Sequence, residues 1–287
     1  MRRTSGPSTP RDGQLRMKGP RSIYRRVRHA VRCAAGRDIW FPIQIRVPAV
    51  RHGSEYGGWW ICPLGLGGES VVYSVGIGTD ISFDLSLIET YGLAVYAFDP
   101  TPASIAWVKA QQLPSRYKWQ EVGVAARDGQ APLFPPANPE HISHTLLHRA
   151  GTSSRPIQVE VRRVSTIMRG LGHTRIDVLK MDIEGSEYEV LEEILTNGLD
   201  VNQLLVEFHH RFSEVGIERT RRAINSLNAA GYRVFFASEN RRRVQLHPAS
   251  LRSVPSQRLE AIVVGAADSS MSVPTSTESM SATSHGS

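Results

Sequence analysis

Short apolar runs alternate along the chain with longer segments whose apolar residues recur at helical spacing. Runs of about four to eight apolar residues are typical of buried strands, and the longer periodic segments predict amphipathic helices. Strands that alternate with helices of about ten to fifteen residues indicate parallel βαβ units. The strands expected in the main sheet span residues 71–78, 93–100, 117–124, 176–182, 203–208, 232–238 and 259–265, with a further strand at 157–164 and helices at 80–92, 102–113, 186–197 and 218–231.

The near-continuous apolar character of these strands fits a sheet that helices cover on both faces. We therefore predict an α/β protein with a Rossmann-like, doubly wound, mostly parallel seven-stranded sheet. No helical pattern separates the strands expected at 232–238 and 259–265, so these two should pair as a C-terminal antiparallel hairpin. Ligands of such sheets bind outside the carboxyl ends of the strands, and the residues at strand ends are therefore the candidates for function.

The net charge of +7 comes from the amino-terminal segment. Residues 1–37 contain ten arginines, Lys18 and one acid, Asp12, a balance of +10 that leaves −3 for the rest of the chain. A nucleic-acid-binding domain carries positive charge on its folded surface, so we expect no nucleic-acid partner. The composition predicts a basic, largely disordered tail over residues 1–37, a folded domain over 38–265 and a disordered Ser/Thr-rich tail over 266–287.

Residues 21–34 of the basic tail have apolar residues at helical spacing, with arginines on the other faces. A basic amphipathic helix of this kind could contact an anionic membrane weakly, and an Arg-rich, acid-poor start is also typical of an organellar transit peptide. A solvated helix docked on the folded domain is the interpretation that we favour over both. No pattern in the sequence indicates the oligomeric state.

Two cysteines, Cys33 and Cys62, are too few for a disulfide framework, which favours a reducing compartment. The sequence has no run of about 18 apolar residues that could span a membrane, and its first residues lack the apolar core of a secretory signal. We therefore expect a cytoplasmic protein.

The first predicted strand ends in Gly76 and Gly78, which would let the backbone turn tightly and approach a ligand closely. A dinucleotide fingerprint requires a third glycine where this chain has Ile81, so NAD is disfavoured. Asp99 ends the second strand, 23 residues after Gly76. A carboxylate at this place can accept hydrogen bonds from both hydroxyls of an adenosine ribose, although Asp before proline is also a common turn residue.

The third predicted strand leads into Ala125 and Ala126, small residues that could form a wall against an adenine ring. Asp128 or a backbone amide would then lie near the adenine amino group. The pair Asp128-Gly129 is equally well explained as a turn, and the sequence leaves the two interpretations open.

Three charged residues, Lys180, Asp182 and Glu184, stand at the end of an apolar strand. Alternate residues of a strand share a face, so Lys180 and Asp182 should point the same way. Ser186-x-x-Glu189 is a capping-box pattern that predicts the start of the next helix. Burial of such charges without partners would be costly. They are better explained by each other, by solvent and by a ligand.

The neighbouring predicted strand ends in a similar way, with Glu207 and His209 on one face. The two strand ends together form a general acid–base group, because a carboxylate or an imidazole can take a proton from a substrate hydroxyl. A structural Lys180–Glu207 ion pair is the plain alternative. Two carboxylates and a histidine could also hold a divalent metal, but the spacing does not require one and we predict none.

Four segments in this order resemble the FkbM family of S-adenosylmethionine (SAM)-dependent methyltransferases. They read VYSVGIGTDISFD, VYAFDPTP, IDVLKMDIEGSEYEVL and LLVEFHHRF, and the similarity extends over roughly residues 56–265. The resemblance implies the fold of class I methyltransferases, with SAM bound at the ends of the first two strands.

The resemblance also implies roles for individual residues. It places Gly76, Gly78 and Asp99 at the cofactor, and Asp182 and Glu184 beside the reacting methyl group. The commonest first motif of the family reads Asp-x-Gly-Ala-Asn, whereas this chain has Ser74 in place of the acid and Gly78 in place of the Asn. The departure affects contacts at the methionine end of SAM, and the sequence offers Asp80 or Asp84 as a replacement.

Family members with a known reaction methylate hydroxyl oxygens, often on sugars or polyketides. The resemblance therefore implies O-methylation of a small-molecule or glycan acceptor. In the expected mechanism Asp182 or His209 takes the hydroxyl proton and Lys180 orients a carboxylate. The alternative is a catalytically weak or inactive scaffold of the same fold that acts through its basic amino-terminal segment.

Overall fold

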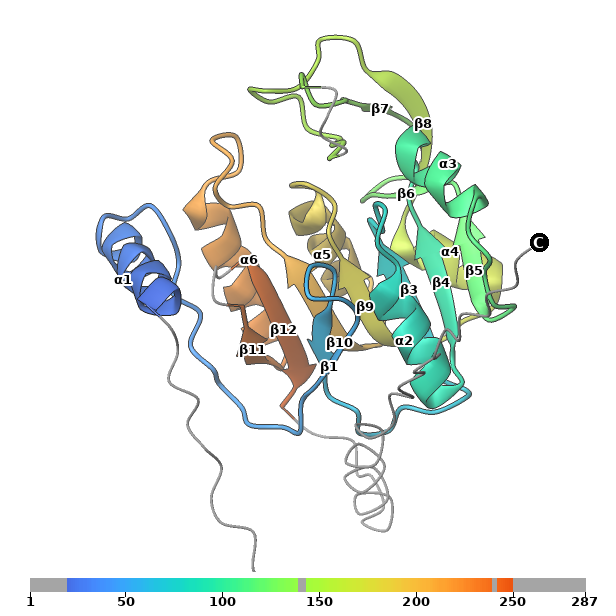
Figure 1. Ribbon diagram of the computed structural model, residues 1–287, viewed down its shortest axis with the longest axis horizontal. Helices are drawn as coiled ribbons and strands as arrows, with labels where there is room; N and C mark the ends of the chain where they lie inside the picture. The colour runs from blue at the N-terminus through green and yellow to red at the C-terminus, as the bar shows by residue number, and fades with distance from the viewer. Residues whose placement is uncertain (1–19, 139–142, 239–241, 250–287) are drawn as a thin grey trace, which may run out of the picture.

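The computed structural model describes residues 20–138, 143–238 and 242–249. A seven-stranded sheet in the order β11-β12-β10-β9-β3-β4-β5 forms its centre (Figure 1). Strands β5, β4, β3, β9 and β10 are parallel, whereas β12 is antiparallel to both of its neighbours. The predicted Rossmann-like, mostly parallel sheet is confirmed. Its strands are β3 (Val71–Val75), β4 (Ala94–Phe98), β5 (Tyr117–Gln120), β9 (Ile176–Met181), β10 (Val201–Glu207), β11 (Tyr232–Ala237) and β12 (Arg243–Pro248).

The C-terminal antiparallel hairpin is present, but its second strand is not the segment that the sequence indicated. β11 pairs with β12 at residues 243–248, and the predicted strand at 259–265 lies outside the described residues. β12 was missed because it carries the polar residues Gln245 and His247 inside the sheet, where both are buried. A strand with this composition lacks the apolar run that marked the others.

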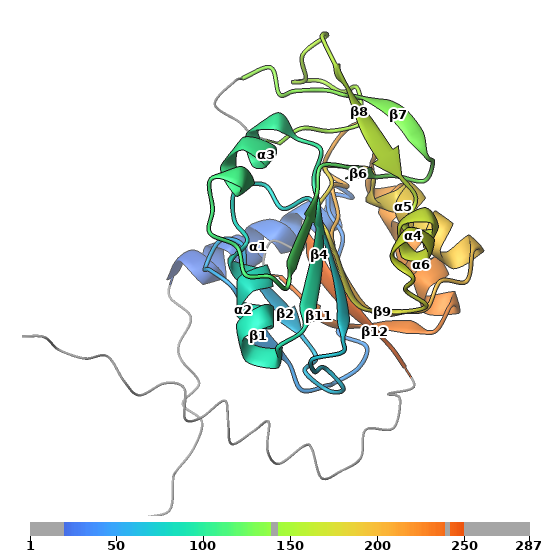
Figure 2. The same ribbon diagram turned by 90° about the vertical axis from the view of Figure 1, so that its right-hand side faces the viewer.

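Helices cover both faces of the sheet, as Figures 1 and 2 show. Phe83 and Leu87 of α2 (Ser82–Tyr91) and Val108 of α3 (Pro102–Lys109) belong to one apolar core. A second apolar core contains residues of α5 and of two further helices, one of which, α4, was not predicted. The bounds of these three helices are α4 (Val164–Leu171), α5 (Glu187–Thr196) and α6 (Ile217–Ala229).

Two small sheets flank the main one. A three-stranded sheet in the order β6-β8-β7 lies above the carboxyl ends of the parallel strands (Figures 1 and 2). The strand predicted at 117–124 is therefore divided between two sheets, as β5 and β6, and the strand predicted at 157–164 is β8. The remaining bounds are β1 (Val50–His52), β2 (Trp59–Ile61), β6 (Gly123–Val124), β7 (Gly129–Leu133) and β8 (Ile157–Arg162).

The amino-terminal helix α1 (Pro20–Ala34) is docked on the domain through Asp38, which is 2% exposed. The Asp38 carboxylate accepts hydrogen bonds from Arg32 of α1 (3.2 Å) and from Arg211 (2.7 Å), and lies 2.8 Å from the His210 Nε2 atom. Burial alone would raise the pKa of Asp38, but His210, the Ile39 amide and the Arg211 charge lower it to about 2. The helix is docked, as the favoured interpretation held.

The first 19 residues of the predicted amino-terminal tail and all of the predicted tail at 266–287 lie outside the described residues. Among the helices that the structure describes, none combines the length and the apolar composition needed to cross a bilayer.

Gln203 joins β10 to the segment that follows β2, and its side chain is fully buried. It accepts a hydrogen bond from the Cys62 amide and donates one to the Cys62 carbonyl, both at 2.8 Å. Gln203→Ala would leave both backbone groups buried and unpaired, at about 1–3 kcal/mol each. We expect a loss of about 2–5 kcal/mol in the free energy of unfolding, measured by urea titration.

The matched control is Gln111→Ala, because the Gln111 side chain is exposed. This control should change the free energy of unfolding by less than about 0.5 kcal/mol. Equal effects of the two substitutions would show that the Gln203 link does not stabilise the sheet.

Candidate functional site

The turn between β3 and α2 is held between the carboxyl ends of two neighbouring strands. The Gly76 amide donates to the Phe98 carbonyl of β4 (3.0 Å), and the Asp182 amide donates to the Val75 carbonyl (3.1 Å). A Cβ atom on Gly76 would lie 1.8 Å from the Asp182 carbonyl oxygen, and Gly76 and Gly78 have positive φ angles of 72° and 58°. Glycine is therefore required at Gly76, and the turn can place its backbone close to a ligand.

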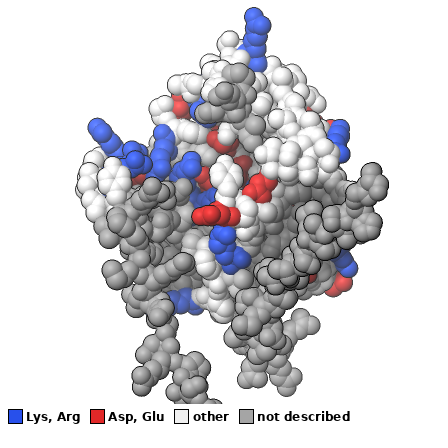
Figure 3. Space-filling model, in the orientation of Figure 1, with Lys and Arg blue, Asp and Glu red and all other residues white. Residues whose placement is uncertain are grey.

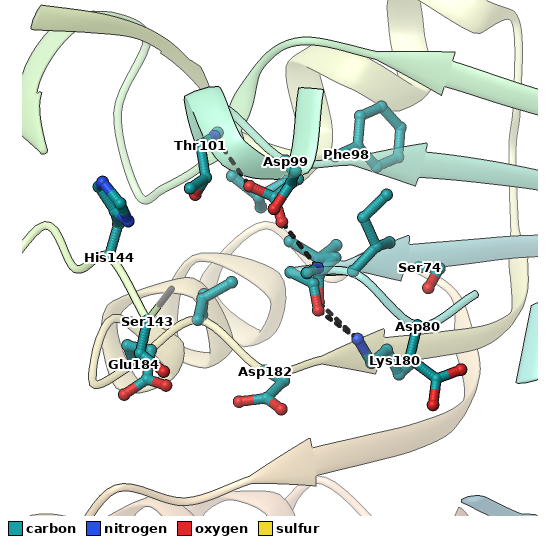
Figure 4. A pocket seen from close by; sticks show the side chains of 18 of the residues that line it. Ser74, Asp80, Phe98, Asp99, Thr101, Ser143, His144, Lys180, Asp182 and Glu184 are labelled. Atoms are coloured by element: carbon teal, nitrogen blue, oxygen red, sulfur yellow. Dashed lines mark hydrogen bonds between the residues drawn. The ribbon is translucent and has the colours of Figure 1, made fainter. Parts of the chain in front are cut away.

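A cavity opens in front of this turn, and we call it the turn cavity (Figure 4). Its walls come from the β3–α2 turn, the ends of β4 and β9, and the loop that follows β7. Most of the predicted site residues line it: Gly76, Gly78, Asp80, Asp99, Lys180, Asp182 and Glu184.

Asp99 is 5% exposed, and its carboxylate is held in place by the backbone. One oxygen accepts a hydrogen bond from the Gly78 amide (3.0 Å) and the other from the Thr101 amide (2.9 Å), as Figure 4 shows. Each carboxylate oxygen has two lone pairs. Both oxygens therefore keep an acceptor position for a ligand in the turn cavity.

Asp80 also lines the turn cavity, where it accepts hydrogen bonds from the Ser54 hydroxyl (2.6 Å) and the Ser82 amide (2.9 Å). Burial alone would raise the pKa of Asp80, but the hydrogen bonds from Ser54 and Ser82 lower it below its ordinary value. The carboxylate is thus stabilised as an anion at the edge of the cavity.

Asp128 is not brought to the predicted adenine contact. Its carboxylate accepts hydrogen bonds from the Arg163 guanidinium (2.8 Å) and the Thr166 hydroxyl (2.9 Å), and it is absent from the walls of the turn cavity. The Arg163 amide, at the start of α4, donates to the same carboxylate (2.9 Å). Asp128 therefore fixes the beginning of α4, a role that could not be foreseen without knowing of that helix.

Lys180 is buried, and its ammonium group donates to the carbonyl oxygens of Val75 (3.3 Å) and Gly76 (Figure 4). These bonds hold the β3–α2 turn against the end of β9. Among the described residues, no ion pair joins Lys180 to Glu207, and Lys180 makes no hydrogen bond to a catalytic carboxylate. The hydrogen bonds of Lys180 therefore position the turn, while its charge lowers the pKa values of the nearby Asp182 and Asp84 carboxyls against the raising effect of burial.

Asp84 of α2 is 2% exposed and lines the turn cavity. Burial raises the pKa of Asp84 to about 6, against the opposing positive charge of Lys180. Within the described part of the chain, its Oδ1 atom has no hydrogen-bond partner. A buried acceptor without a donor is costly, so a donor group of a ligand or a water would stabilise this wall.

Asp182, Glu184 and His209 come together at the ends of β9 and β10, as the sequence predicted. The His209 Nε2 atom lies 3.7 Å from Oδ1 of Asp182 and 3.5 Å from Oε2 of Glu184. On the other side of the ring, the Nδ1 atom lies 3.3 Å from Oε1 of Glu187 in the first turn of α5. Glu187 is fully buried and also accepts the His209 amide (2.8 Å). It therefore fixes the orientation of the imidazole ring through the Nδ1 atom, on the side away from Asp182 and Glu184.

Sequence reasoning missed Glu187 and assigned the helix start to a capping box. Ser186 makes no side-chain capping bond, and the Glu187 carboxylate instead accepts the Gly185 amide (2.9 Å). An acidic residue in the first turn of a helix was the available signal, since helix N-termini favour negative charge. Its contact with His209 depends on the pairing of β9 with β10.

The charges around His209 change the pKa values of the group. Burial alone would lower the pKa of His209, but the hydrogen bond and charge of Glu187, with the charges of Asp182 and Glu184, raise it to about 9. Burial and the Glu207 charge raise the pKa of Asp182 to about 6, against the opposing charges of His209 and Lys180. At neutral pH the group therefore combines an imidazolium with a mostly ionised Asp182.

Glu207 is bound by two arginines at the start of β12, Arg242 (3.3 Å) and Arg243 (2.6 Å). Burial would raise the pKa of Glu207, but the two positive charges lower it. Glu207 is thus held as an anion and is poorly suited to accept a proton, contrary to its predicted catalytic role.

Asp182, Glu207 and His209 are close enough to raise the question of a metal ion. Each places one oxygen or nitrogen within 4.8 Å of the others, a spacing that a divalent cation could use. Two of the three are already engaged, Glu207 by its arginines and His209 by Glu187. These contacts explain the cluster without invoking an ion.

A second cavity, of about 650 Å³, lies on the far side of the acidic strand end, and we call it the arginine cleft. Asp182 and Glu184 line both cavities, together with Tyr56, Ser143 and Arg243. The two cavities therefore share a wall. Ligands bound on its two sides would meet at Asp182, which is the arrangement that a group transfer needs.

Glu187→Gln should lower the pKa of His209 from about 9 toward its ordinary value of 6.5, because a neutral amide oxygen replaces the charged carboxylate beside the Nδ1 atom. An NMR titration of the histidine ring resonances measures this change. Glu189→Gln is the matched control, since Glu189 lies on the same helix but pairs with Arg219. An unchanged pKa in Glu187→Gln would contradict the assigned contact.

The same pKa predicts a pH dependence of stability. The folded-state pKa of His209, about 9, lies above the ordinary value of 6.5. Its stabilising contribution is therefore complete below about pH 6.5 and is lost as the pH rises through about 9. Urea titrations across this pH range should show that the free energy of unfolding falls less with rising pH in Glu187→Gln than in the parent protein.

Comparison with known proteins finds relatives among methyltransferase-like proteins. The chain is 29% identical over 142 residues to the human protein described as probable methyltransferase-like protein 24, and 28% identical over 142 residues to its counterpart from Rattus norvegicus. The matched region is 48% of this chain and 32% of each relative, so the chain matches about a third of the relatives' length.

Among solved structures, a pre-rRNA processing fibrillarin from Methanococcus jannaschii aligns over 63% of this chain and 66% of its own, with a TM-score of 0.36 and 11% identity. The sequence model of the methyltransferase FkbM domain gives a match over residues 73–234, more than half of the chain. That span includes the β3–α2 turn, Asp99, the acidic strand end and His209. The chain therefore belongs to the family of proteins with a methyltransferase FkbM domain.

Proposed function

We propose that this methyltransferase uses SAM to methylate a hydroxyl oxygen on a sugar, a polyketide or another small-molecule or glycan acceptor. The observation that carries the proposal is the wall shared by the turn cavity and the arginine cleft, which has Asp182 and Glu184 on it and His209 beside them. This arrangement supports a cofactor on one side and an acceptor on the other.

The residues of the turn cavity fit the chemical groups of SAM. Asp99 has acceptor positions for the two ribose hydroxyls. Gly76 and Gly78 allow backbone to approach the cofactor closely. The unpaired oxygen of Asp84 suits the ammonium group of the methionine end, where the chain has Ser74 in place of the family's acid. When bound, SAM supplies an electrophilic methyl group on a positively charged sulfur.

Asp182 is the proton acceptor that the geometry favours. It lies on the shared wall and is about a quarter exposed, so an acceptor hydroxyl in the arginine cleft can reach it. A pKa of about 6 leaves Asp182 ionised at neutral pH yet basic enough to take a proton. Asp182 would take the hydroxyl proton, and bound SAM would supply the methyl group to the acceptor oxygen, its carbon–sulfur bond breaking to leave neutral S-adenosylhomocysteine.

His209 is better suited to positioning than to proton abstraction at neutral pH. With a pKa of about 9 it is protonated and cannot accept a further proton. Its positive charge, fixed from behind by Glu187, stabilises the ionised carboxylates of Asp182 and Glu184. The earlier alternative that His209 is the base is therefore the weaker one.

Calorimetric titration with S-adenosylhomocysteine, with NAD as the control ligand, tests the cofactor. We expect binding of S-adenosylhomocysteine only, and a loss of about tenfold or more in Asp99→Asn, since hydrogen bonds to charged groups contribute about 1.5–3 kcal/mol. Asp128→Asn is the matched control and should bind like the parent. Asp182→Asn should keep its affinity within a few-fold, because it acts on the acceptor.

The possible negative results of this titration test different parts of the proposal. No binding by a folded parent protein would overturn the SAM proposal and favour a scaffold that has lost its ligand. Equal losses in Asp99→Asn and Asp128→Asn would reject the assigned ribose contact.

A further inference from the structure

The walls of the arginine cleft carry an unusual concentration of guanidinium groups. They come from three segments that are distant in sequence: helix α1, the loop after β10 and the start of β12. The arginines are Arg28, Arg32, Arg211, Arg242 and Arg243. Figure 3 shows Lys and Arg side chains beside α1, next to the acidic side chains at the centre of the same face.

The ion pairs of the cleft leave positive charge uncompensated. Asp38 is shared by Arg32 and Arg211, and each pair includes the same Oδ2 atom. Glu207 is likewise shared by Arg243 of β12 and the preceding Arg242, through one oxygen each. One carboxylate neutralises one guanidinium, so each of these two clusters keeps a net charge of about +1. They are built to hold positive charge in place rather than to cancel it.

Arg28 adds a third positive charge at the α1 side of the cleft. It is exposed, and no hydrogen bond or ion pair joins its side chain to the residues that the structure describes. It lies one turn before Arg32, which Asp38 anchors, so the helix presents both arginines from a fixed position. Docking of α1 thus places an available guanidinium at the cleft.

The opposite wall of the cleft is acidic. Asp182 and Glu184 lie on it beside the turn cavity, with Arg243 on the same wall, and Glu55 is a further acidic lining residue. The basic end lies under α1, where Arg28, Arg32 and Arg211 line the cleft and the last two pair with Asp38. A ligand that fits both ends carries a neutral hydroxyl at one side and an anionic group at the other. Guanidinium groups bind carboxylate, sulfate and phosphate through paired hydrogen bonds.

We propose that the arginine cleft is the acceptor site and that the acceptor is an oxyanion-bearing hydroxyl compound, such as a sugar phosphate, sugar sulfate or sugar acid. The anionic group binds at the basic end formed by α1 and its neighbours, and the hydroxyl lies at Asp182. This inference rests on the proposed function, since it uses the same shared wall. It assigns α1 to the acceptor site.

Ligand-observed NMR with protein saturated in S-adenosylhomocysteine tests the basic end without requiring the natural acceptor. The probes are glucose 6-phosphate, glucuronate, glucose and inorganic phosphate. We expect glucose 6-phosphate to bind about tenfold or more tightly than glucose, and inorganic phosphate to compete with it. Glucuronate in place of the phosphate compound distinguishes a preference for carboxylate from one for phosphate.

Arg28→Gln should weaken the binding of glucose 6-phosphate about fivefold or more, because it removes a guanidinium group from the basic end. The Arg28 side chain is exposed, so the substitution should not disturb the fold. Arg169→Gln is the matched control: Arg169 is exposed on α4 and absent from the walls of the cleft. Affinity for S-adenosylhomocysteine, measured in the same samples, should be unchanged in both. If the parent protein did not bind S-adenosylhomocysteine at all, that result would count against the cofactor proposal instead.

Three results would overturn the inference while leaving the cofactor proposal intact. They are equal binding of glucose and glucose 6-phosphate, no binding of any anionic probe, and equal effects of Arg28→Gln and Arg169→Gln. Sedimentation with phosphatidylserine vesicles tests whether α1 binds an anionic membrane instead. If Arg28→Gln reduced vesicle binding but not sugar-phosphate binding, α1 would be a membrane contact and the acceptor assignment would be wrong.

Discussion

The site depends on the position of β3 between β4 and β9. Hydrogen bonds to both neighbours hold the end of this strand, and the Asp182 carbonyl lies so close to Gly76 that no side chain fits there. Parallel pairing also brings the carboxyl ends of all these strands to one edge of the sheet. Asp99 and Asp182 reach the same cavity for that reason, although 82 intervening residues separate them.

A second constraint is the cost of charge inside the protein. Asp38, Glu187 and Glu207 are carboxylates at most 5% exposed, and each is held by donors from another part of the chain. Removing one partner of such a pair leaves the other charge buried. The pairs therefore fix α1, His209 and β12 around Asp182, and they leave Asp182 itself as the carboxylate most open to the cleft among those facing His209.

The sequence predicted the main sheet and much of the site because those features are local. Apolar runs between turns mark the parallel strands, and glycine and aspartate at strand ends mark the ligand side of the sheet. β12 was missed because its buried residues Gln245 and His247 are polar and find their place only inside the sheet. Asp128 and Lys180 engage partners that the sequence did not indicate, since α4 and the turn carbonyls are not visible as patterns.

The sequence alone determined the α/β class, the family resemblance and the residues at the strand ends, because spacing and residue type specify secondary structure and the edge at which ligands bind. Only the tertiary structure decided the charge state and the accessibility of each of those residues. Burial and neighbouring charges make His209 a cation, hold Glu207 as an anion between two arginines and leave Asp182 as the more open carboxylate, which we propose as the base. The docking of α1 through Asp38 was likewise decided in three dimensions, since its partners His210 and Arg211 lie more than 170 residues away.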